Sequence, residues 1–188
     1  MSRPVAIALA TLTVVLPFGL LAWLLLTDDD DEGDGIGGVT AVQEADADVE
    51  VGARLPDFVL EDLYGEPTRL SDFRGKPVVL TFFASWCNPC QEEMPVLQEA
   101  WEERLDEFTA VAVSYNDLAR DTRVFVEELG VTYPVLLDVN DTVLDRYGLR
   151  GIPQTFFLDE DGVLLDKVYG ITTREALDEP LDALLDGA

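Results

Sequence analysis

VVLTFFASWCNPCQEEMP, residues 78–95, is the stretch from which the fold can be predicted. It begins with a β-prone and largely apolar run, Val78 to Phe83, which predicts a buried central strand. The small residues Ala84 and Ser85 then predict a turn. Pro89 fits the first turn of a helix, where its missing N–H costs no hydrogen bond. The pattern therefore predicts a strand, a tight turn and a helix from about residue 88 to residue 107, which Pro95 should kink.

The two cysteines of the chain, Cys87 and Cys90, stand where this helix should begin. Unpaired N–H groups and the positive end of the helix dipole stabilise a thiolate there. Cys87 is therefore the expected nucleophile and is expected to be exposed. Cys90, one helical turn further on, is the expected resolving thiol and is close enough to form a disulfide with Cys87.

Structural explanations of the cysteine pair are weaker than redox chemistry. A disulfide across so short a loop removes little chain entropy and would stabilise the fold weakly. A structural zinc site needs about four ligands, whereas the chain has two cysteines and no histidine. The sequence therefore predicts a redox pair and no metal site.

Trp86-Cys87-Asn88-Pro89-Cys90, with Glu93 and Pro95, resembles the W-C-x-P-C-x-x-E-x-P signature of TlpA/ResA-like thiol–disulfide oxidoreductases. The resemblance covers roughly residues 54–186 and implies a thioredoxin fold. It also implies that Glu93 accepts a proton from Cys90 or tunes its pKa. Spacing alone would equally explain Glu93 by the helix dipole. Trp86 is expected either to pack over the cysteine pair or to be a plain core residue.

Gly151-Ile152-Pro153-Gln154-Thr155 resembles the cis-proline loop of the same family. That loop faces the two cysteines and offers backbone groups to an extended substrate, so Ile152 and Pro153, together with Trp86, are expected to bind substrate. Cis X–Pro bonds are uncommon, and this expectation rests on the resemblance. Two positions depart from related patterns. Thr81 stands where thioredoxins carry a buried aspartate, so that internal base is missing, and Gln154 occupies a variable position that leaves substrate choice open.

The whole domain, residues 51–188, predicts an α/β fold in which helices cover both faces of a central mixed sheet. An N-terminal edge hairpin is expected around a turn at residues 64–67, followed by a helical turn at 71–75. The further expected elements are a strand at 109–114, a helix at 122–129, a strand at 133–137, a helix at 142–147, strands at 154–158 and 163–169, and a helix at 174–185. The segment from 122 to 137 fits the central insertion of the resembling family.

Residues 1–27 predict one transmembrane helix that anchors the chain. Pro4 to Leu26 are 23 consecutive uncharged residues, enough to span a bilayer of about 30 Å. Arg3 before this run and the acidic residues after it place the N-terminus in the cytoplasm and the domain outside the cell membrane. A cleaved signal peptide is the alternative, but no A-x-A site ends the run. Residues 28–50, rich in acidic residues and glycine, predict a disordered linker.

The formal net charge is −26, and Lys76 and Lys167 are the only lysines. Such a chain has no basic patch for nucleic acid phosphates. Residues 51–188 alone hold 28 acidic and 11 basic residues. This acidity is typical of a halophilic protein, whose self-repulsion is screened by salt, although a mesophilic protein can also be acidic. For a halophilic protein, the melting temperature should rise with salt concentration.

Together these features predict a membrane-anchored, extracytoplasmic thiol–disulfide oxidoreductase that needs no cofactor beyond its cysteines. The resemblance implies that its partners are a protein with paired thiols, such as an apocytochrome c, and a membrane electron donor. Glu92 and Glu93 should disfavour a nearby thiolate, which predicts a reductant rather than an oxidant.

Two other functions fit the sequence less well. A thiol peroxidase of the peroxiredoxin type would need the pattern P-x-x-x-[ST]-x-x-C, but Leu80 and Ala84 occupy its marker positions before Cys87. A copper-delivery protein of thioredoxin fold could bind Cu(I) through two thiolates, but the chain has no histidine to complete the site.

Overall fold

The computed structural model describes residues 49–170 and 173–186. The predicted anchor and nearly all of the predicted linker lie outside these residues. Within the described residues, no helix combines the length and the apolar composition needed to cross a membrane. The described residues all belong to one compact unit.

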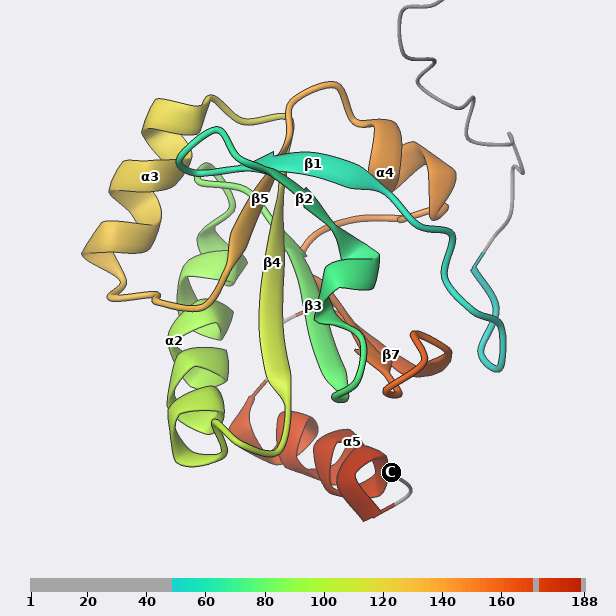
Figure 1. Ribbon diagram of the computed structural model, residues 1–188. Helices are drawn as coiled ribbons and strands as arrows, with labels where there is room; N and C mark the ends of the chain where they lie inside the picture. Colours follow the sequence, from blue (N-terminus) through green and yellow to red (C-terminus); the bar gives the residue numbers. More distant parts are fainter. Residues whose placement is uncertain (1–48, 171–172, 187–188) are drawn as a thin grey trace, which may run out of the picture. The chain divides into compact units, whose positions relative to one another are not determined.

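A mixed sheet of seven strands forms the centre of this unit, in the order β2-β1-β5-β4-β3-β6-β7 (Figure 1). β3 pairs in parallel with β4, and β4 pairs in parallel with β5, whereas β6 joins the other side of β3 antiparallel. The predicted central strand is β3, which is buried along its whole length. The strands are β1 (Val59–Asp62), β2 (Pro67–Arg69), β3 (Val78–Phe83), β4 (Thr109–Tyr115), β5 (Val135–Asp138), β6 (Gln154–Leu158) and β7 (Leu164–Tyr169).

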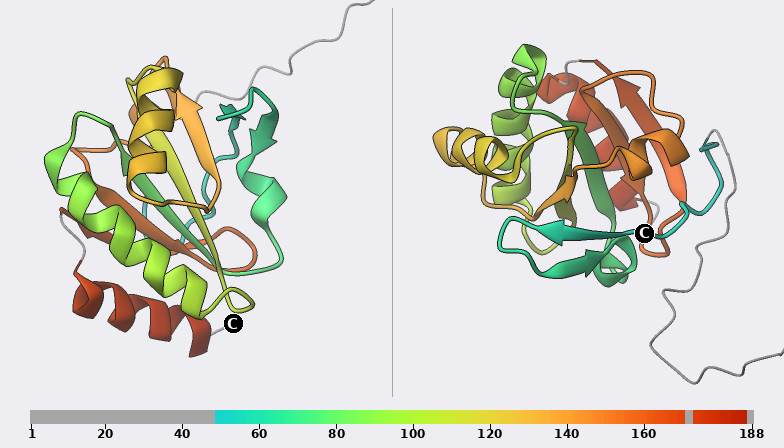
Figure 2. Two further views of the ribbon diagram at one scale, coloured as in Figure 1. Left: turned by 90° about the vertical axis from the view of Figure 1, so that its left-hand side faces the viewer. Right: turned by 90° about the horizontal axis from the view of Figure 1, so that it is seen from above.

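Helices cover both faces of the sheet, as predicted (Figure 2). Three helices pack against one face: α2 (Asn88–Glu103), α3 (Ala119–Glu128) and α5 (Arg174–Asp186). The other face is covered by α4 (Thr142–Arg146) and the 3₁₀ helix η1 (Leu70–Phe73).

Each strand of the centre supplies both cores because successive side chains point to opposite faces. In β3, Val79 and Phe83 pack on the α2 face, and Leu80 and Phe82 pack on the α4 face. The central run is therefore apolar on both sides, as its composition indicated, apart from Thr81.

The element types predicted for the domain, residues 51–188, are all present, but several bounds differ. α2 ends at Glu103, four residues before the predicted end, because the chain turns at Arg104, whose N–H donates to the Trp101 carbonyl. Pro95 lies inside α2 without ending it. α3 begins at Ala119 rather than residue 122, and β5 begins at Val135, directly after Pro134, which has no N–H for a strand ladder.

The topology brings two distant segments to one edge of the sheet. The parallel strands β3 and β4 both end there, and α2 begins there. Because β6 runs antiparallel to β3, its first residue pairs with the end of β3, Gln154 with Phe82. The loop before β6, which contains Ile152 and Pro153, therefore lies next to the turn that carries Cys87.

Candidate active site

Cys87 and Cys90 form a disulfide at the N-terminus of α2. Cys87 is the N-cap of the helix, and Pro89 lies in its first turn, as predicted. The backbone N–H of Cys90 donates to Cys87 Sγ at 3.2 Å, so the sulfur of Cys87 receives a helix N-terminal donor. This contact supports the physical basis for assigning the nucleophile to Cys87.

The prediction that Cys87 is exposed is wrong, because only 5% of the residue is accessible, against 0% of Cys90. Its side chain bonds to Cys90 and belongs to the buried cluster on the α2 face of the sheet. Trp86 is instead 58% exposed, with its ring edge-on to Tyr115 at 6.0 Å. The interpretation of Trp86 as a plain core residue is therefore wrong, since the ring lies at the surface against Tyr115.

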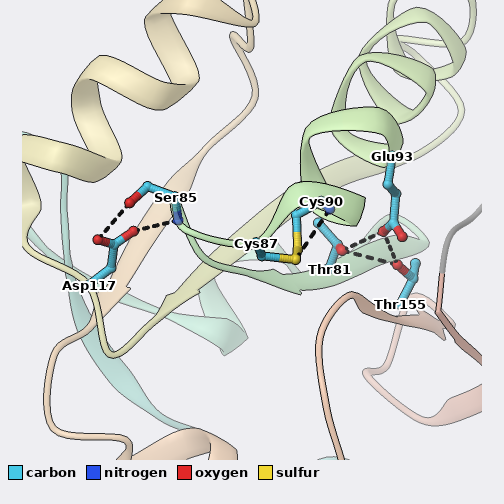
Figure 3. Close-up of a disulfide and its surroundings, with 7 residues drawn as sticks. All are labelled: Thr81, Ser85, Cys87, Cys90, Glu93, Asp117 and Thr155. Atoms are coloured by element: carbon cyan, nitrogen blue, oxygen red, sulfur yellow. Dashed lines mark hydrogen bonds between the residues drawn. A yellow bond between two sulfur atoms is a disulfide. The ribbon is translucent and has the colours of Figure 1, made fainter.

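Asp117 holds the turn before Cys87 in place. This role of Asp117 was not predicted from the sequence. Its Oδ2 accepts the backbone N–H of Ser85 at 2.7 Å, and its Oδ1 accepts the Ser85 hydroxyl at 2.9 Å (Figure 3). The backbone N–H of Leu118 also donates to Oδ1. Asp117 follows β4 at the edge where β3 and β4 both end, a placement that could have indicated it. It fixes the position of the residues that present Cys87.

Glu93 is buried in α2, one turn after Cys90, with 1% of the residue exposed. Its Oε1 accepts the hydroxyl of Thr81 at 2.8 Å and lies 2.7 Å from the hydroxyl of Thr155 (Figure 3). Glu92, its neighbour in the sequence, is exposed. A carboxylate buried among hydroxyl groups is better suited to proton transfer than to a surface interaction with the helix dipole.

The buried phenol of Tyr133 interacts electrostatically with Glu93. Burial raises the pKa of Tyr133, and the negative charge of Glu93 raises it further. Its hydroxyl donates to the backbone carbonyl of Met94 in α2. Tyr133 is therefore a neutral group at physiological pH.

The Ile152–Pro153 peptide bond is cis, as predicted from the resemblance. Ile152 and Trp86 line one cavity of about 360 Å³, which brings these two predicted residues together. Arg150 and Asp145 supply charges of opposite sign to the same cavity. Gln154 is buried after the cis bond, and its Oε1 has no hydrogen-bond partner among the described residues.

Metal ligands are not gathered anywhere in the described part of the chain: residues 49–170 and 173–186 contain no group of three or more histidine, cysteine, aspartate or glutamate residues placed to hold an ion. The chemistry that the site offers is that of two sulfurs and a buried carboxyl group.

Comparison with known proteins agrees with this geometry. The sequence matches the AhpC/TSA family over residues 51–167. It is 36% identical over 137 residues to the thiol-disulfide oxidoreductase ResA of Geobacillus thermodenitrificans, covering 72% of this chain and 79% of that protein.

Two solved structures share the fold. One is of a thiol:disulfide interchange protein DsbE from Chlorobium tepidum, with a TM-score of 0.68 and 30% identity, covering 73% of this chain and 99% of that one. The other is the peroxidoxin BcpB of Mycobacterium tuberculosis, with a TM-score of 0.63 and 28% identity, covering 72% of this chain and 96% of that one.

Proposed function

The chain belongs to the AhpC/TSA family of thioredoxin-fold proteins and is a thiol–disulfide oxidoreductase, and we propose that it reduces protein disulfides outside the cytoplasm. The observation that carries this proposal is the Cys87–Cys90 disulfide at a helix N-terminus, beside cis-Pro153 and one turn from the buried Glu93. These three groups supply a redox pair, a backbone that can receive a polypeptide, and a proton acceptor.

The reaction proceeds in two exchange steps. The thiolate of Cys87 attacks one sulfur of the substrate disulfide, and the other substrate sulfur leaves as a thiolate and takes up a proton from water. Cys90 then gives its proton to Glu93 and attacks Cys87 Sγ. The bond between Cys87 and the substrate breaks, the second substrate thiolate is released and protonated, and two electrons have passed to the substrate.

Substrate binding is assigned to Trp86, Ile152 and Pro153. Trp86, the residue before Cys87, is exposed, and together with Ile152 it lines one cavity. An extended segment of a partner protein would lie along the cis-proline loop with its sulfur against Cys87. The resembling family includes reductants for cytochrome c maturation, so an apocytochrome c with paired thiols is the first partner to test. A membrane electron donor would regenerate the thiols.

The reduction potential of the pair tests the direction of electron flow. A strong oxidant has a specially stabilised thiolate, whereas Glu93 places a buried carboxyl group one helical turn after Cys90. We expect a potential below about −200 mV, among the reducing members of the thioredoxin-like proteins. Equilibrating the protein with a thiol–disulfide buffer at several ratios measures this value. A potential close to that of the strong oxidants, about −120 mV, would contradict the assignment as a reductant.

The proposed location depends on residues 1–27 acting as an uncleaved membrane anchor. The expected result is a membrane-bound protein whose intact mass includes Pro4 to Leu26. Mass spectrometry of the protein extracted from membranes measures this directly. A mature N-terminus after Leu26 would show that the segment is a cleaved signal peptide, and protease added outside intact cells should digest the domain if it faces outwards.

A thiol peroxidase is the second candidate, because a peroxidoxin shares the fold. Leu80 and Ala84, at the marker positions of the peroxidase pattern, are both fully buried and have no side-chain polar atom to hold a peroxide. We expect reduced protein to react with hydrogen peroxide far more slowly than with a protein disulfide. Stopped-flow measurement of both rates on one sample compares them, and a faster reaction with peroxide would favour the peroxidase.

A further inference from the structure

Three buried oxygen atoms from three different elements lie within hydrogen-bond distance of one another (Figure 3). Thr81 Oγ1 in β3 and Thr155 Oγ1 in β6 lie 2.8 Å and 2.7 Å from Glu93 Oε1 in α2. The two threonine hydroxyls are 3.0 Å apart. None of the three residues is more than 1% exposed. We call this arrangement the Thr–Glu–Thr triangle.

The sheet register creates the triangle. Thr81 and Thr155 are directly opposite each other in the antiparallel pair of β3 and β6, so their side chains point to the same face. Their neighbours on that face, Val79, Phe83 and Phe157, are apolar and belong to the core under α2. Two hydroxyls in such a place cost free energy unless they are hydrogen-bonded, and Glu93 supplies the partner.

Counting protons shows that the triangle fits both forms of Glu93. A threonine hydroxyl has one proton to donate and two lone pairs. When Glu93 is a carboxylate, both hydroxyls can donate to Oε1. When Oε1 carries a proton, it can donate to Thr155, whose hydroxyl turns to donate to Thr81, while Thr81 still donates to Oε1. The three oxygen–oxygen contacts stay the same, and only one hydroxyl proton changes direction.

We propose that Thr81 and Thr155 are positioning residues that hold the carboxyl group of Glu93 in one place while it gains and loses the proton of Cys90. This inference rests on the proposed role of Glu93 in the exchange reaction. It assigns a function to Thr81, which occupies the place of the thioredoxin aspartate. The proton acceptor is on the helix, and the strand position supplies the donor that keeps it oriented.

The titratable groups around Glu93 do not take over the positioning of its carboxyl group by Thr81 and Thr155. Cys90 and Cys87 are the sulfurs that it serves, and both precede it on the side of α2 that packs on the sheet. Tyr133, from the segment before β5, also interacts with the charge of Glu93, and burial keeps that phenol neutral. Thr81 and Thr155 themselves do not titrate, so they change the behaviour of Glu93 only through their hydrogen bonds.

A chromogenic aryl disulfide separates the two exchange steps in the full-length reduced protein. Attack by Cys87 releases one coloured thiolate, and attack by Cys90 on the mixed disulfide releases the second. The rate of the second release, measured against pH, reports the proton transfer from Cys90. We expect this rate to rise with pH through a midpoint set by Glu93, and we expect Glu93→Gln to remove that midpoint.

Thr81→Val removes a donor to the carboxylate with little change of volume. Because a hydrogen bond to a charged group is lost, Glu93 should keep its proton to a higher pH, and the midpoint should move up by about one to two pH units. The rate above the new midpoint should return to that of the unchanged protein. Thr155→Val should raise the midpoint by less, since the Thr155 hydroxyl also accepts a hydrogen bond from protonated Glu93. Thr81→Ser, which keeps the hydroxyl, should restore the original midpoint.

Thr122→Val is the matched control, because Thr122 is fully buried and its Oγ1 has no partner among the described residues. It should leave the midpoint unchanged. An unchanged midpoint in Thr81→Val, or an equal loss of rate at every pH, would overturn the role of the triangle while leaving the proposed function intact. A midpoint that survives in Glu93→Gln would instead overturn the role of Glu93. Thr81→Ala gives the same readout should the valine variant not fold.

Discussion

Replacing Cys87 with serine is expected to abolish disulfide reduction completely, and replacing Cys90 with serine is expected to stop the reaction halfway. Cys87 Sγ accepts the backbone N–H of Cys90 at the helix N-terminus, and Cys87 is the less buried of the two cysteines. A thiolate at this place attacks an incoming disulfide. Cys90→Ser keeps this nucleophile but removes the resolving thiol, so a mixed disulfide with the substrate should accumulate.

The measurement is the mass of the covalent adduct formed with a disulfide-containing partner protein, before and after added reductant. Cys90→Ser should yield a reducible adduct, Cys87→Ser should yield none, and the double variant serves as the control for non-specific attachment. Alkylation of the unchanged reduced protein with limiting reagent should label Cys87 first. An adduct on Cys90 in the Cys87→Ser variant would reverse the assigned roles. The same trap, used in intact cells, identifies the natural partner.

Local sequence predicted the cysteine site well because its geometry depends on neighbouring residues. A strand, a turn and a helix N-cap follow one another within the segment from Val78 to Cys90, and each has its own residue preferences. The exposure of Cys87 could not be predicted in the same way, since it depends on the direction of the side chain once the sulfur bonds to Cys90. The cis bond before Pro153 was predicted only through the resemblance to a family.

The supporting contacts depend on segments far apart in the sequence. Thr81 and Thr155 are separated by 74 positions, and Ser85 and Asp117 by 32. Their contacts become visible only when the register of β3 with β6, and the common end of β3 and β4, are known. One indication was present in the sequence, because Thr81 is a single polar residue inside an apolar strand. A polar residue in that position needs a buried partner.

Glu93→Gln is expected to slow the attack of Cys90 on the mixed disulfide by about 10²–10⁴-fold near neutral pH, the usual contribution of a general base. The first attack by Cys87 should change little, because that thiolate is stabilised by the helix N-terminus. Glutamine has nearly the same volume as glutamate, and its amide oxygen can still accept from Thr81 and Thr155. The variant therefore removes the proton acceptor while keeping the packing of α2 on β3 and β6.

Glu92→Gln is the matched control, since it removes the same charge from the adjacent and exposed position. If Glu93 acted only through its negative charge, Glu93→Gln would favour the thiolate of Cys90 and would not slow its attack. Glu92→Gln should have a small effect in either case, because its exposed charge is screened by solvent and salt. If Glu93 accepts the proton of Cys90, only Glu93→Gln should slow the second thiolate release. Equal rates in the two variants would leave Glu93 with a structural role, and Cys90 would then have to lose its proton to water.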